Sequence, residues 1–396
     1  MTQTICYVLA EFPVLSETFV TNEIRAMRAL GHRVVPVTLV NYDGPCQPQD
    51  EAMRDEAVKL SSISRMALFG IRPDRLAAAW RFIRAQKGLP AHSLLMAGAK
   101  VASVIKREGA THVHAHFAHS SAATAIVAAR LAGVTVSFIG HGCDIYGGHV
   151  DLPAKLAEAD LVFATCKDMA RDFLDFCPTA NVVVNFCGID PDLFSPAAGP
   201  RNGRLLAIGR LAEQKGYPVL LEALALIPAQ RRPVVDVIGT GPLQDELKAA
   251  TERLGLQDHV QFCGARTSAW IASAGPAYRG LVAPFVICKN GDRDTGPVVV
   301  KEALAMELPV VVSALMGLKE MVTPDCGRQV PVGDAAALAD ALVWLNELDE
   351  PTRSRLGAAG RARVRHNYTL AGQAQVMTAA IEAMQVKVRG RVACAA

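Results

Sequence analysis

Short runs of β-branched and other apolar residues alternate with Ala- and Leu-rich stretches, and this alternation limits the folds open to the chain. Residues 4–12 are strand-like, residues 16–31 have helical spacing, and residues 32–40 are strand-like again. The same order recurs within residues 111–142. Because such strands are apolar on both faces, helices must cover both sides of a parallel sheet. The alternation predicts an α/β fold built from repeated βαβ units.

A Pro-, Gly- and Ala-rich stretch at residues 191–203 interrupts the alternation, which then restarts. We therefore expect an N-terminal domain at residues 1–190, a linker at 191–203 and a C-terminal domain at 204–368. Both are expected to be Rossmann-like, doubly wound and facing each other across a cleft. Ligands would bind in that cleft, at the carboxyl ends of the strands.

Several classes of protein are disfavoured by composition. The formal charge of +3 is too small to indicate nucleic-acid binding. Ten cysteines with no CxxC pair indicate reduced, buried thiols in a cytoplasmic enzyme. Residues 1–13 lack the basic start and the long apolar run of a signal peptide. The apolar window at residues 120–140 carries Arg130 and predicts a helix and a buried strand, not a membrane span.

The loop AIGRLAEQKG, residues 207–216, follows a predicted strand and carries two cations. Gly209 allows a sharp turn, and Arg210 and Lys215 are close enough in sequence to bind one anion together. The alternative is a solvated charged loop. A second turn, VIGTGP, places Gly239 and Gly241 after the next strand, but it is not a GxGxxG fingerprint and is weak alone.

The stretch GDRDTGPVVVKEALA, residues 291–305, reads as a loop, a Gly-Pro turn and a helix. Pro297 suits the first helical turn, where backbone N–H groups can bind an anion. Asp294 precedes this helix start and Glu302 lies inside the helix. The alternative is a capping Asp and a surface Glu.

Three histidines, His112, His114 and His116, are spaced to share one face of a strand. Three imidazoles could in principle bind zinc. The alternative is packing, or a place in a substrate cleft.

In their order along the chain, these motifs resemble the retaining glycosyltransferases of family 4, which have the GT-B fold. The matching segments are GRLAEQKG, GTGP, the element from Asp294 to Glu302, and HGCDIY at residues 141–146. The segments FPVLSETFVTNEI and HVHAHFAHSSAATA resemble the bacterial subgroup that makes exopolysaccharides of the colanic-acid type. The GT-B fold implies that a C-terminal helix, within residues 369–396, returns to the N-terminal domain.

The resemblance implies a role for each matched position. Arg210 and Lys215 would bind the donor diphosphate, and Glu302 the ribose hydroxyls. Asp294 would contact the donor sugar, and His141 would hydrogen-bond that sugar near the reacting centre. The other implied donor-binding residues are Gly209, Gly239, Gly241, Arg266, Thr295, Gly296 and Pro297. The implied acceptor-cleft residues are Ser16, Glu17, Thr18, His116, His119 and Asp144.

Two positions depart from the family pattern. The first acid is usually Glu and here is Asp294, one methylene shorter, so the identity of the donor sugar does not carry over. The usual Pro-Ser after the preceding strand is replaced by Pro284-Phe285.

The resemblance implies transfer, with retention, from a nucleotide-diphosphate sugar to a saccharide or a lipid-linked saccharide. A UDP-sugar is favoured, and a GDP-sugar is the alternative. Negative charge on the leaving diphosphate would be stabilised electrostatically, with neither a covalent nucleophile nor a metal or other cofactor. A nucleotide-sugar epimerase, which needs no acceptor, and a catalytically weakened binding partner are the competing interpretations.

Residues 65–107 combine nine basic residues with one acid and interleaved apolar side chains. Leu76, Trp80 and Ile83 have helical spacing, with Arg81 and Arg84 beside them. A basic amphipathic helix suits the anionic inner face of a membrane. The alternative is that the apolar stripe packs on the sheet and the arginines are merely solvated.

Overall fold

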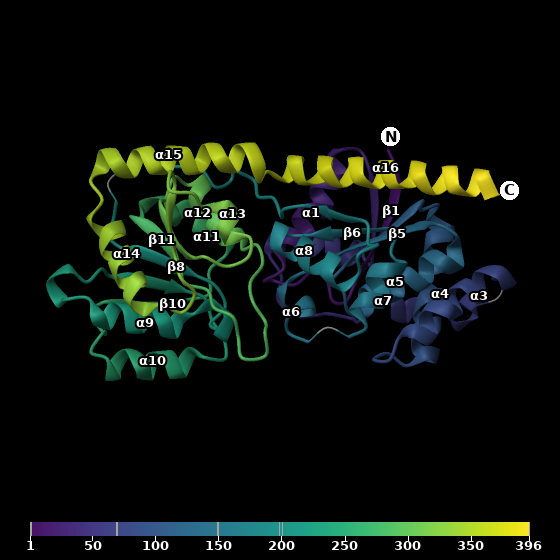
Figure 1. Cartoon of the computed structure of the whole chain (residues 1–396), viewed down its shortest axis with the longest axis horizontal. Helices are drawn as coiled ribbons and strands as arrows, with labels where there is room; N and C mark the ends of the chain where they lie inside the picture. Colours follow the sequence, from purple (N-terminus) through teal and green to yellow (C-terminus); the bar gives the residue numbers. More distant parts are fainter. Residues whose placement is uncertain (1, 69, 149, 198, 200, 396) are drawn as a thin grey trace. The chain divides into compact units, whose positions relative to one another are not determined.

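The computed structural model consists of two compact units, Met1–Gly188 with Leu370–Ala396, and Ile189–Thr369. It describes residues 2–68, 70–148, 150–197, 199 and 201–395, with the backbone alone at 65 and 391–395. The long C-terminal helix α16 belongs to the first unit, as predicted (Figure 1).

The sheet of the first unit is parallel in every pairing, with the order β3-β2-β1-β4-β5-β6-β7. This is the doubly wound order, and its direction reverses between β1 and β4. Loops that leave β1 and β4 on their carboxyl side diverge there, which makes room for a ligand. The strands are β1 Thr4–Leu9, β2 Arg33–Thr38, β3 Val58–Lys59, β4 His112–His116, β5 Thr135–Ile139, β6 Leu161–Ala164 and β7 Val182–Val184.

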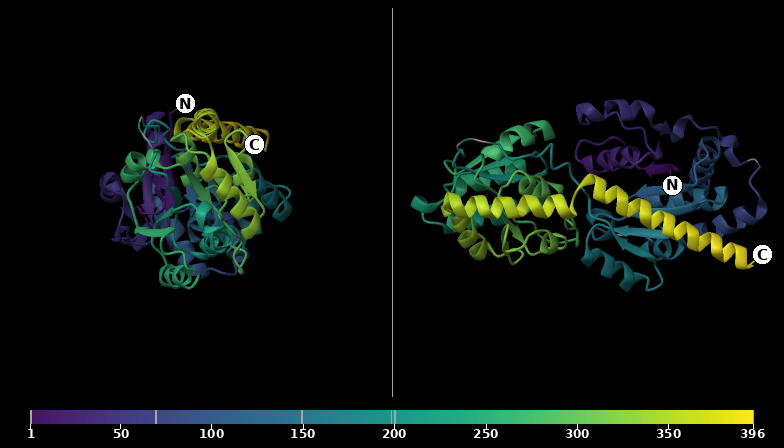
Figure 2. Two further views of the ribbon diagram at one scale, coloured as in Figure 1. Left: turned by 90° about the vertical axis from the view of Figure 1, so that its left-hand side faces the viewer. Right: turned by 90° about the horizontal axis from the view of Figure 1, so that it is seen from above.

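Helices cover both faces of this sheet. α4 and α5 contact one face, with α3 packed outside them, whereas α1 and α16 pack together over the other (Figure 1; Figure 2, right). Met377, Ile381 and Met384 of α16 join Ile24 and Met27 of α1 in one buried cluster. The helices are α1 Thr18–Ala29, α2 Glu51–Glu56, α3 Pro73–Ala85, α4 Ala91–Glu108, α5 Ser120–Ala132, α6 Gly142–Ile145, α7 Leu152–Glu158, α8 Lys167–Phe176 and α16 Leu370–Ala395.

The second unit repeats the topology, with the order β10-β9-β8-β11-β12-β13 and a reversal between β8 and β11. Its core joins α9 and α14 to the central strands. The strands are β8 Leu205–Ile208, β9 Val235–Ile238, β10 Val260–Gly264, β11 Gly280–Ala283, β12 Val310–Ser313 and β13 Gly327–Val330. The helices are α9 Tyr217–Leu226, α10 Gln244–Arg253, α11 Ser268–Ala274, α12 Val298–Ala305, α13 Leu318–Met321, α14 Ala335–Glu347 and α15 Glu350–Asn367.

The stretch at residues 191–203, the expected linker, is assigned to the second unit. Arg201 donates to the carbonyls of Pro276 and Tyr278, at 2.9 Å each, and so holds this segment there. The chain passes between the units at 188–189 and again at 369–370.

Two predictions from composition have different outcomes. Residues 120–140 form α5 and β5, as predicted. In the part of the chain that the structure describes, no helix is long and apolar enough to span a bilayer. The prediction of buried thiols is wrong at exposed Cys143 and at half-buried Cys46 and Cys263. Cys143 lies on the short helix α6, Cys46 on a loop and Cys263 on the edge strand β10.

Candidate functional site

The predicted residues of the first unit lie at the carboxyl ends of three neighbouring strands, β1, β4 and β5. Parallel strands end at the same edge of a sheet, so the fold brings these loops together. Ser16, Glu17 and Thr18 follow β1, His116 and His119 lie at or after the end of β4, and His141 and Asp144 follow β5.

These residues differ in how accessible they are. Ser16 and His119 are exposed, and Glu17 and Thr18 are half-buried. Burial raises the pKa of the Glu17 carboxyl, and nearby His116 partly offsets this. Asp144 is fully buried and accepts hydrogen bonds from the backbone N–H groups of Ala118 and His141.

Burial raises the pKa of Asp144 to about 7, although those N–H groups oppose the shift. Because the Asp144 carboxylate is fully buried and binds backbone N–H groups of two loops, it joins these loops and does not face a cleft. Ser16, Glu17, Thr18 and His119 remain the members of the predicted acceptor set that are at least partly accessible.

The three histidines of β4 share one face, as predicted, and all are buried. His112 lies 2.8 Å from Thr135 Oγ1 through Nδ1 and 2.7 Å from Ser137 Oγ through Nε2. His114 Nδ1 lies 2.8 Å from the same Ser137 hydroxyl. Burial lowers the pKa of His112 to about 3 and that of His114 well below its usual range. Both rings are therefore neutral at physiological pH.

Glu23 of α1, which the sequence analysis missed, lies at the centre of this row and is fully buried. Its Oε1 accepts from the Tyr7 hydroxyl at 3.0 Å and lies 3.1 Å from His116 Nε2. Its Oε2 accepts from Gln373 Nε2 of α16 at 2.8 Å. Glu23, His114 and His116 have ligand-type atoms within 4.8 Å of one another. This cluster, and not the predicted row of three histidines, has metal-ligand spacing.

His141, at the amino end of the short helix α6, is also buried. Its ring accepts from the backbone N–H of Asp144, and its Nε2 lies 3.3 Å from His116 Nδ1. The rings of Phe19 and Phe117 each lie 4.6 Å from the His141 ring. Burial lowers the pKa of His141 well below its usual range. The ring is thus neutral and confined on several sides.

In the second unit, two predicted site residues form an ion pair. Lys215 Nζ lies 2.6 Å from Asp294 Oδ2, and both side chains are mostly buried. The ammonium also lies 4.2 Å from the centre of the Phe285 ring, a cation–π distance. The two departures from the family pattern, Asp294 and Phe285, therefore both contact Lys215.

Two other charged residues in this region have unused capacity. Arg210 is exposed, and within the described chain no residue forms a hydrogen bond or ion pair with its guanidinium. The Glu302 carboxylate, on α12, likewise has no hydrogen-bonding partner among the described residues, yet the residue is only 8% exposed. Burial raises the pKa of Glu302 to about 7, and Lys301 opposes the shift. A cation and an acid are thus available to a ligand.

The start of α12 differs slightly from the prediction. Pro297 is the N-cap and the helix begins at Val298, one residue later than predicted. Its φ of −61° fits Pro, but its ψ of 126° is extended, so it lies outside the helix. Thr295 is buried, and the Gly296 N–H donates to Asp294 Oδ1 at 3.3 Å.

The glycines after β8 and β9 allow the two turns to approach each other. A Cβ on Gly239 would lie 1.9 Å from the Gly209 carbonyl oxygen, and one on Gly241 would lie 2.4 Å from that of Leu211. These glycines therefore have a packing role whether or not a ligand binds. Arg266, after β10, is exposed and lies 5.4 Å from the Trp270 ring.

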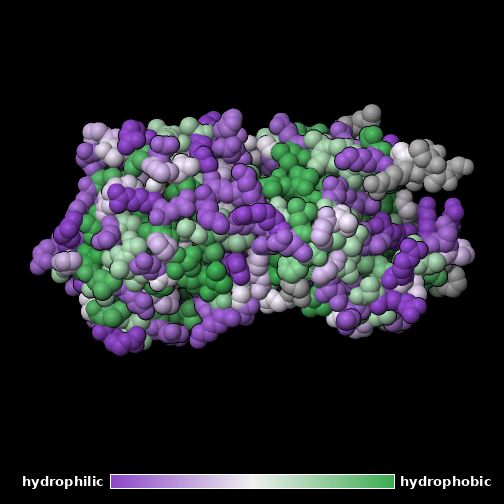
Figure 3. Space-filling model, viewed as in Figure 1, coloured by the Kyte–Doolittle hydropathy of each residue, from purple (hydrophilic) through white to green (hydrophobic). Residues whose placement is uncertain are grey.

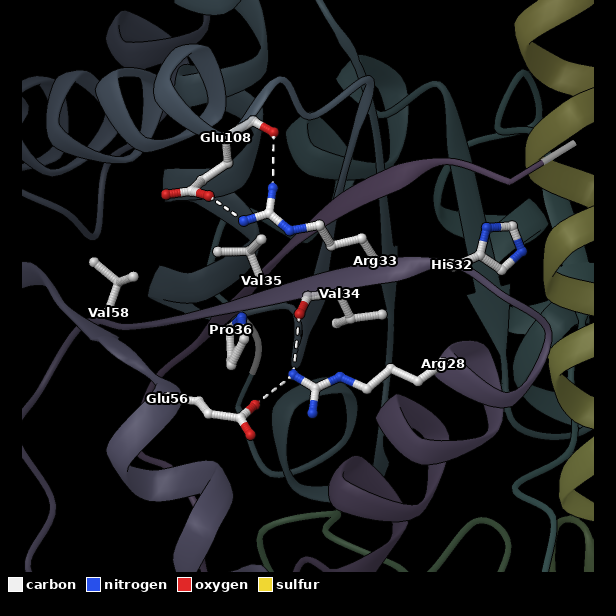
Figure 4. Close-up of a pocket in the computed structure, with 9 residues that line it drawn as sticks. All are labelled: Arg28, His32, Arg33, Val34, Val35, Pro36, Glu56, Val58 and Glu108. Carbon is white, nitrogen blue, oxygen red and sulfur yellow. Dashed lines mark hydrogen bonds and ion pairs between the residues drawn. The ribbon is translucent and has the colours of Figure 1, made fainter.

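A hollow of about 530 Å³ lies elsewhere in the first unit, beside β2 and α1 (Figure 4). Its charged groups are already paired: Arg28 with Glu56 and Arg33 with Glu108. Arg33 begins β2, so this hollow is not at the carboxyl edge where the predicted residues gather. We do not place the site there.

Comparison with known proteins supports the resemblance. The model of Glycosyltransferase Family 4 matches residues 16–193, and the model of Glycosyl transferases group 1 matches residues 202–347. WcaL of Escherichia coli (strain K12), named for colanic acid biosynthesis, is 26% identical over 391 residues, covering 91% of this chain and 95% of WcaL. The amylovoran biosynthesis glycosyltransferase AmsK of Erwinia amylovora is 27% identical over 366 residues, covering 85% and 89%.

Among solved structures, Anabaena HepE in complex with UDP superposes with a TM-score of 0.72 at 17% identity, covering 97% of this chain and 100% of HepE. That likeness shows the fold, two Rossmann-like domains of the GT-B type. The two family models together span most of the chain. The chain therefore belongs to the family 4 glycosyltransferases.

Proposed function

We propose that this protein is a retaining glycosyltransferase that transfers a sugar from a nucleotide-diphosphate sugar to a saccharide or lipid-linked saccharide. The observation that carries the proposal is the set of charges at the reversal point of the second sheet. Lys215 is paired with Asp294 there, while Arg210 and Glu302 keep unused hydrogen-bonding capacity.

The Lys215 ammonium suits a leaving diphosphate even though it is paired. An ammonium has three donors, so it can bind Asp294 and a phosphate oxygen together. Arg210 would supply a second, bidentate contact to the same group. Both cations would stabilise the negative charge that develops as the sugar–phosphate bond breaks. With these cations in place we expect metal-independent transfer.

The remaining donor contacts are proposed from the resemblance to the family. Glu302 would accept hydrogen bonds from the two ribose hydroxyls when it is ionised. Asp294 would contact hydroxyls of the donor sugar, and His141 of the first unit would donate to that sugar. Gly209, Gly239, Gly241, Arg266, Thr295, Gly296 and Pro297 would complete the donor site.

We favour a UDP-sugar as the donor and polysaccharide biosynthesis as the process. HepE, which shares the fold, was crystallised with UDP, and both relatives are named for the biosynthesis of a polysaccharide. Ser16, Glu17, Thr18 and His119 are the at least partly accessible residues proposed to contact the acceptor.

The decisive experiment is a hydrolysis and transfer screen with UDP-, GDP- and TDP-sugars, in which NMR records the anomer of the first product before mutarotation. We expect one nucleotide series to be hydrolysed with retention. An inverted first product would contradict the retaining mechanism. Release of a changed nucleotide sugar without acceptor would indicate an epimerase, and no turnover of any donor would indicate a binding partner.

We further propose peripheral binding to the inner membrane face through α3, within residues 65–107. Trp80 is 43% exposed and Leu76 38%, and the exposed cations Arg81, Arg84 and Lys87 accompany them. Hydrophilic and hydrophobic side chains are mixed at the end of the first unit where α3 lies (Figure 3).

Part of the predicted stripe is not available to a membrane. Ile83 and Phe82 are buried, so they pack inside the unit, as the alternative interpretation required. Arg75 is half-buried and donates to the Ala132 carbonyl. The Arg65 side chain and Phe69 lie outside what the structure describes. The proposal therefore rests on Leu76, Trp80 and the cations beside them.

A further inference from the structure

We infer that Glu23 and His116 are positioning residues that hold His141 as a neutral imidazole with its proton on Nε2. The inference rests on the proposed contact between His141 and the donor sugar. It starts from the hydrogen bonds on each side of the His141 ring.

The tautomer of His141 follows from its two neighbours. The ring accepts a hydrogen bond from the Asp144 N–H, and Nε2 faces His116, so Nδ1 is the accepting nitrogen. A nitrogen that accepts carries no proton, and a neutral imidazole has one proton. The proton of His141 must therefore be on Nε2, which then donates to His116 Nδ1.

The same reasoning passes along His116 to Glu23. His116 Nδ1 accepts, so its own proton is on Nε2, 3.1 Å from Glu23 Oε1. An ionised carboxylate can only accept, so it fixes this direction. The other contacts of Glu23, from the Tyr7 hydroxyl and the Gln373 amide, are also donors.

A second arm reaches the same carboxylate from the other end of β4. His114 Nε2 lies 3.5 Å from Glu23 Oε1 and forms no hydrogen bond with any described residue. If the Ser137 hydroxyl donates to His114 Nδ1, His112 Nε2–H donates to Ser137, and His114 directs its own Nε2–H at Glu23. One assignment, with every proton on Nε2, thus satisfies both arms.

This direction matters for the proposed reaction because the Nε2–H that donates to His116 in the free protein is the proton that His141 would offer to a sugar hydroxyl, once the bound donor replaces His116 as its acceptor. Suppose that an amide nitrogen faced His116 in place of the Glu23 carboxylate. His116 would then have to accept at Nε2 and donate from Nδ1. His141 would receive donors at both ring nitrogens while carrying a proton of its own. One of its two contacts would break and the ring would lose its fixed orientation.

The test combines ¹⁵N NMR of the full-length protein, labelled only at histidine, with kinetics. In wild type we expect an Nε2–H signal for His141, identified by its loss in His141→Asn. Glu23→Gln should change the His141 pattern and lower kcat about tenfold or more, by analogy with the partners that orient metal-binding histidines. KM for the donor should change much less.

Tyr7→Phe is the matched control, because it removes a donor from the same Glu23 oxygen but lies off the path to His141. It should leave both the His141 signals and kcat near wild type. Glu23→Asp, which keeps an acceptor-only group, should retain the His141 tautomer. If Glu23→Gln does not fold, the wild-type spectrum still decides the tautomer.

Three results would overturn the inference. One is a proton on Nδ1 of His141 in wild type. Another is an equal loss of kcat in Glu23→Gln and Tyr7→Phe. The third is one equivalent of bound metal in wild type by elemental analysis, because metal-bound Nε2 atoms carry no proton. By contrast, unchanged turnover in His141→Asn with the Nε2–H tautomer confirmed would reject the proposed role of His141 and leave the tautomer assignment intact.

Discussion

The central buried carboxylate of the first unit is fully paired, whereas one buried carboxylate and one exposed guanidinium of the second unit keep capacity for a ligand. Glu23 accepts from Tyr7, His116 and Gln373 in the first unit. In the second unit, neither the Glu302 carboxylate nor the Arg210 guanidinium has a hydrogen-bonding partner among the described residues. Satisfied buried networks make a structure rigid, and unsatisfied buried groups raise its free energy until a ligand pairs with them.

The two units have the same strand order, so the difference arises from what covers the sheet. In the first unit, α1 and α16 pack over the histidine face of β4 and supply Glu23 and Gln373. In the second, the loops after β8 and β11 bring Lys215 onto Phe285 and leave Arg210 exposed. A shared fold thus provides one half suited to holding a side chain and one suited to binding a charged substrate.

The largest effect is expected from removing the charged side chains proposed to bind the donor in the second unit. Lys215→Ala and Glu302→Ala should each lower turnover by 10²–10³-fold, or about 2.7–4 kcal/mol, by analogy with donors to a developing negative charge. Steady-state kinetics with the identified donor measures this. Lys248→Ala, at an exposed cation on α10 of the same unit, should keep full activity. Normal turnover in either site variant would reject the assignment.

Replacing one buried glutamate in each unit by glutamine should change the free energy of unfolding at pH 8 in opposite directions. The raised pKa of Glu302 means that the folded state holds a proton that the unfolded chain loses, so its contribution to stability falls as pH rises from 4.5 to about 7. Glu302→Gln should therefore raise the free energy of unfolding at pH 8, by at most about 3 kcal/mol, and much less at pH 5.

Urea denaturation at the two pH values measures this effect. Glu23→Gln is the matched substitution in the first unit and should lower stability at pH 8, because it weakens charge-assisted hydrogen bonds from buried donors. If Glu302→Gln destabilises the protein as much as Glu23→Gln does, the Glu302 carboxylate has a structural role and is not held open for a ligand.

A substitution at Asp294 tests whether the second unit determines which donor sugar is used. Asp294→Glu restores the usual family acid but lengthens the side chain that contacts Lys215. We expect the ranking of donor sugars to shift by about 1–3 kcal/mol, as for a single methylene in a specificity pocket. Affinity for free nucleotide, measured by titration calorimetry, should change less. A variant with weaker nucleotide binding and the same sugar ranking would count against this role.

The smallest effect concerns the exposed surface of α3 in the first unit. Arg84→Gln should weaken binding to anionic vesicles by about 1 kcal/mol, roughly fivefold, because one cation is removed from the membrane surface. Vesicle sedimentation at low and high salt measures it, with Arg253→Gln on α10 as the control. Wild type that stays in the supernatant at low salt would exclude α3 as a membrane surface.

Local sequence patterns made the charged residues of the second unit predictable. Arg210 and Lys215 lie on one short loop, and Asp294 and Glu302 lie before and within one helix, so sequence spacing alone brought the members of each pair together. Even there the contact of Phe285 with Lys215 was not predictable, because the two residues lie 70 positions apart and meet only through the pairing of β8 with β11.

The buried polar network of the first unit was less predictable, because the residues that bind one another there are far apart in the sequence. An acid among the buried positions of α1, between Val20 and Ile24, was a signal that could have identified Glu23 as a core group. Gln373 lies 350 positions away and gave no such signal. Asp144 matched a family motif, but the motif did not show that backbone N–H groups occupy both of its oxygens.

The discontinuous first unit has a consequence for how the protein is made. Residues 1–188 leave the ribosome long before α16, which supplies Met377, Ile381 and Met384 to their core and Gln373 to Glu23. Until then, one apolar face of the nascent sheet lacks part of its cover, while the second unit, continuous from 189 to 369, can complete its own core. Such a chain should need protection by a chaperone during translation, and the histidine network should be among the last parts of the protein to form.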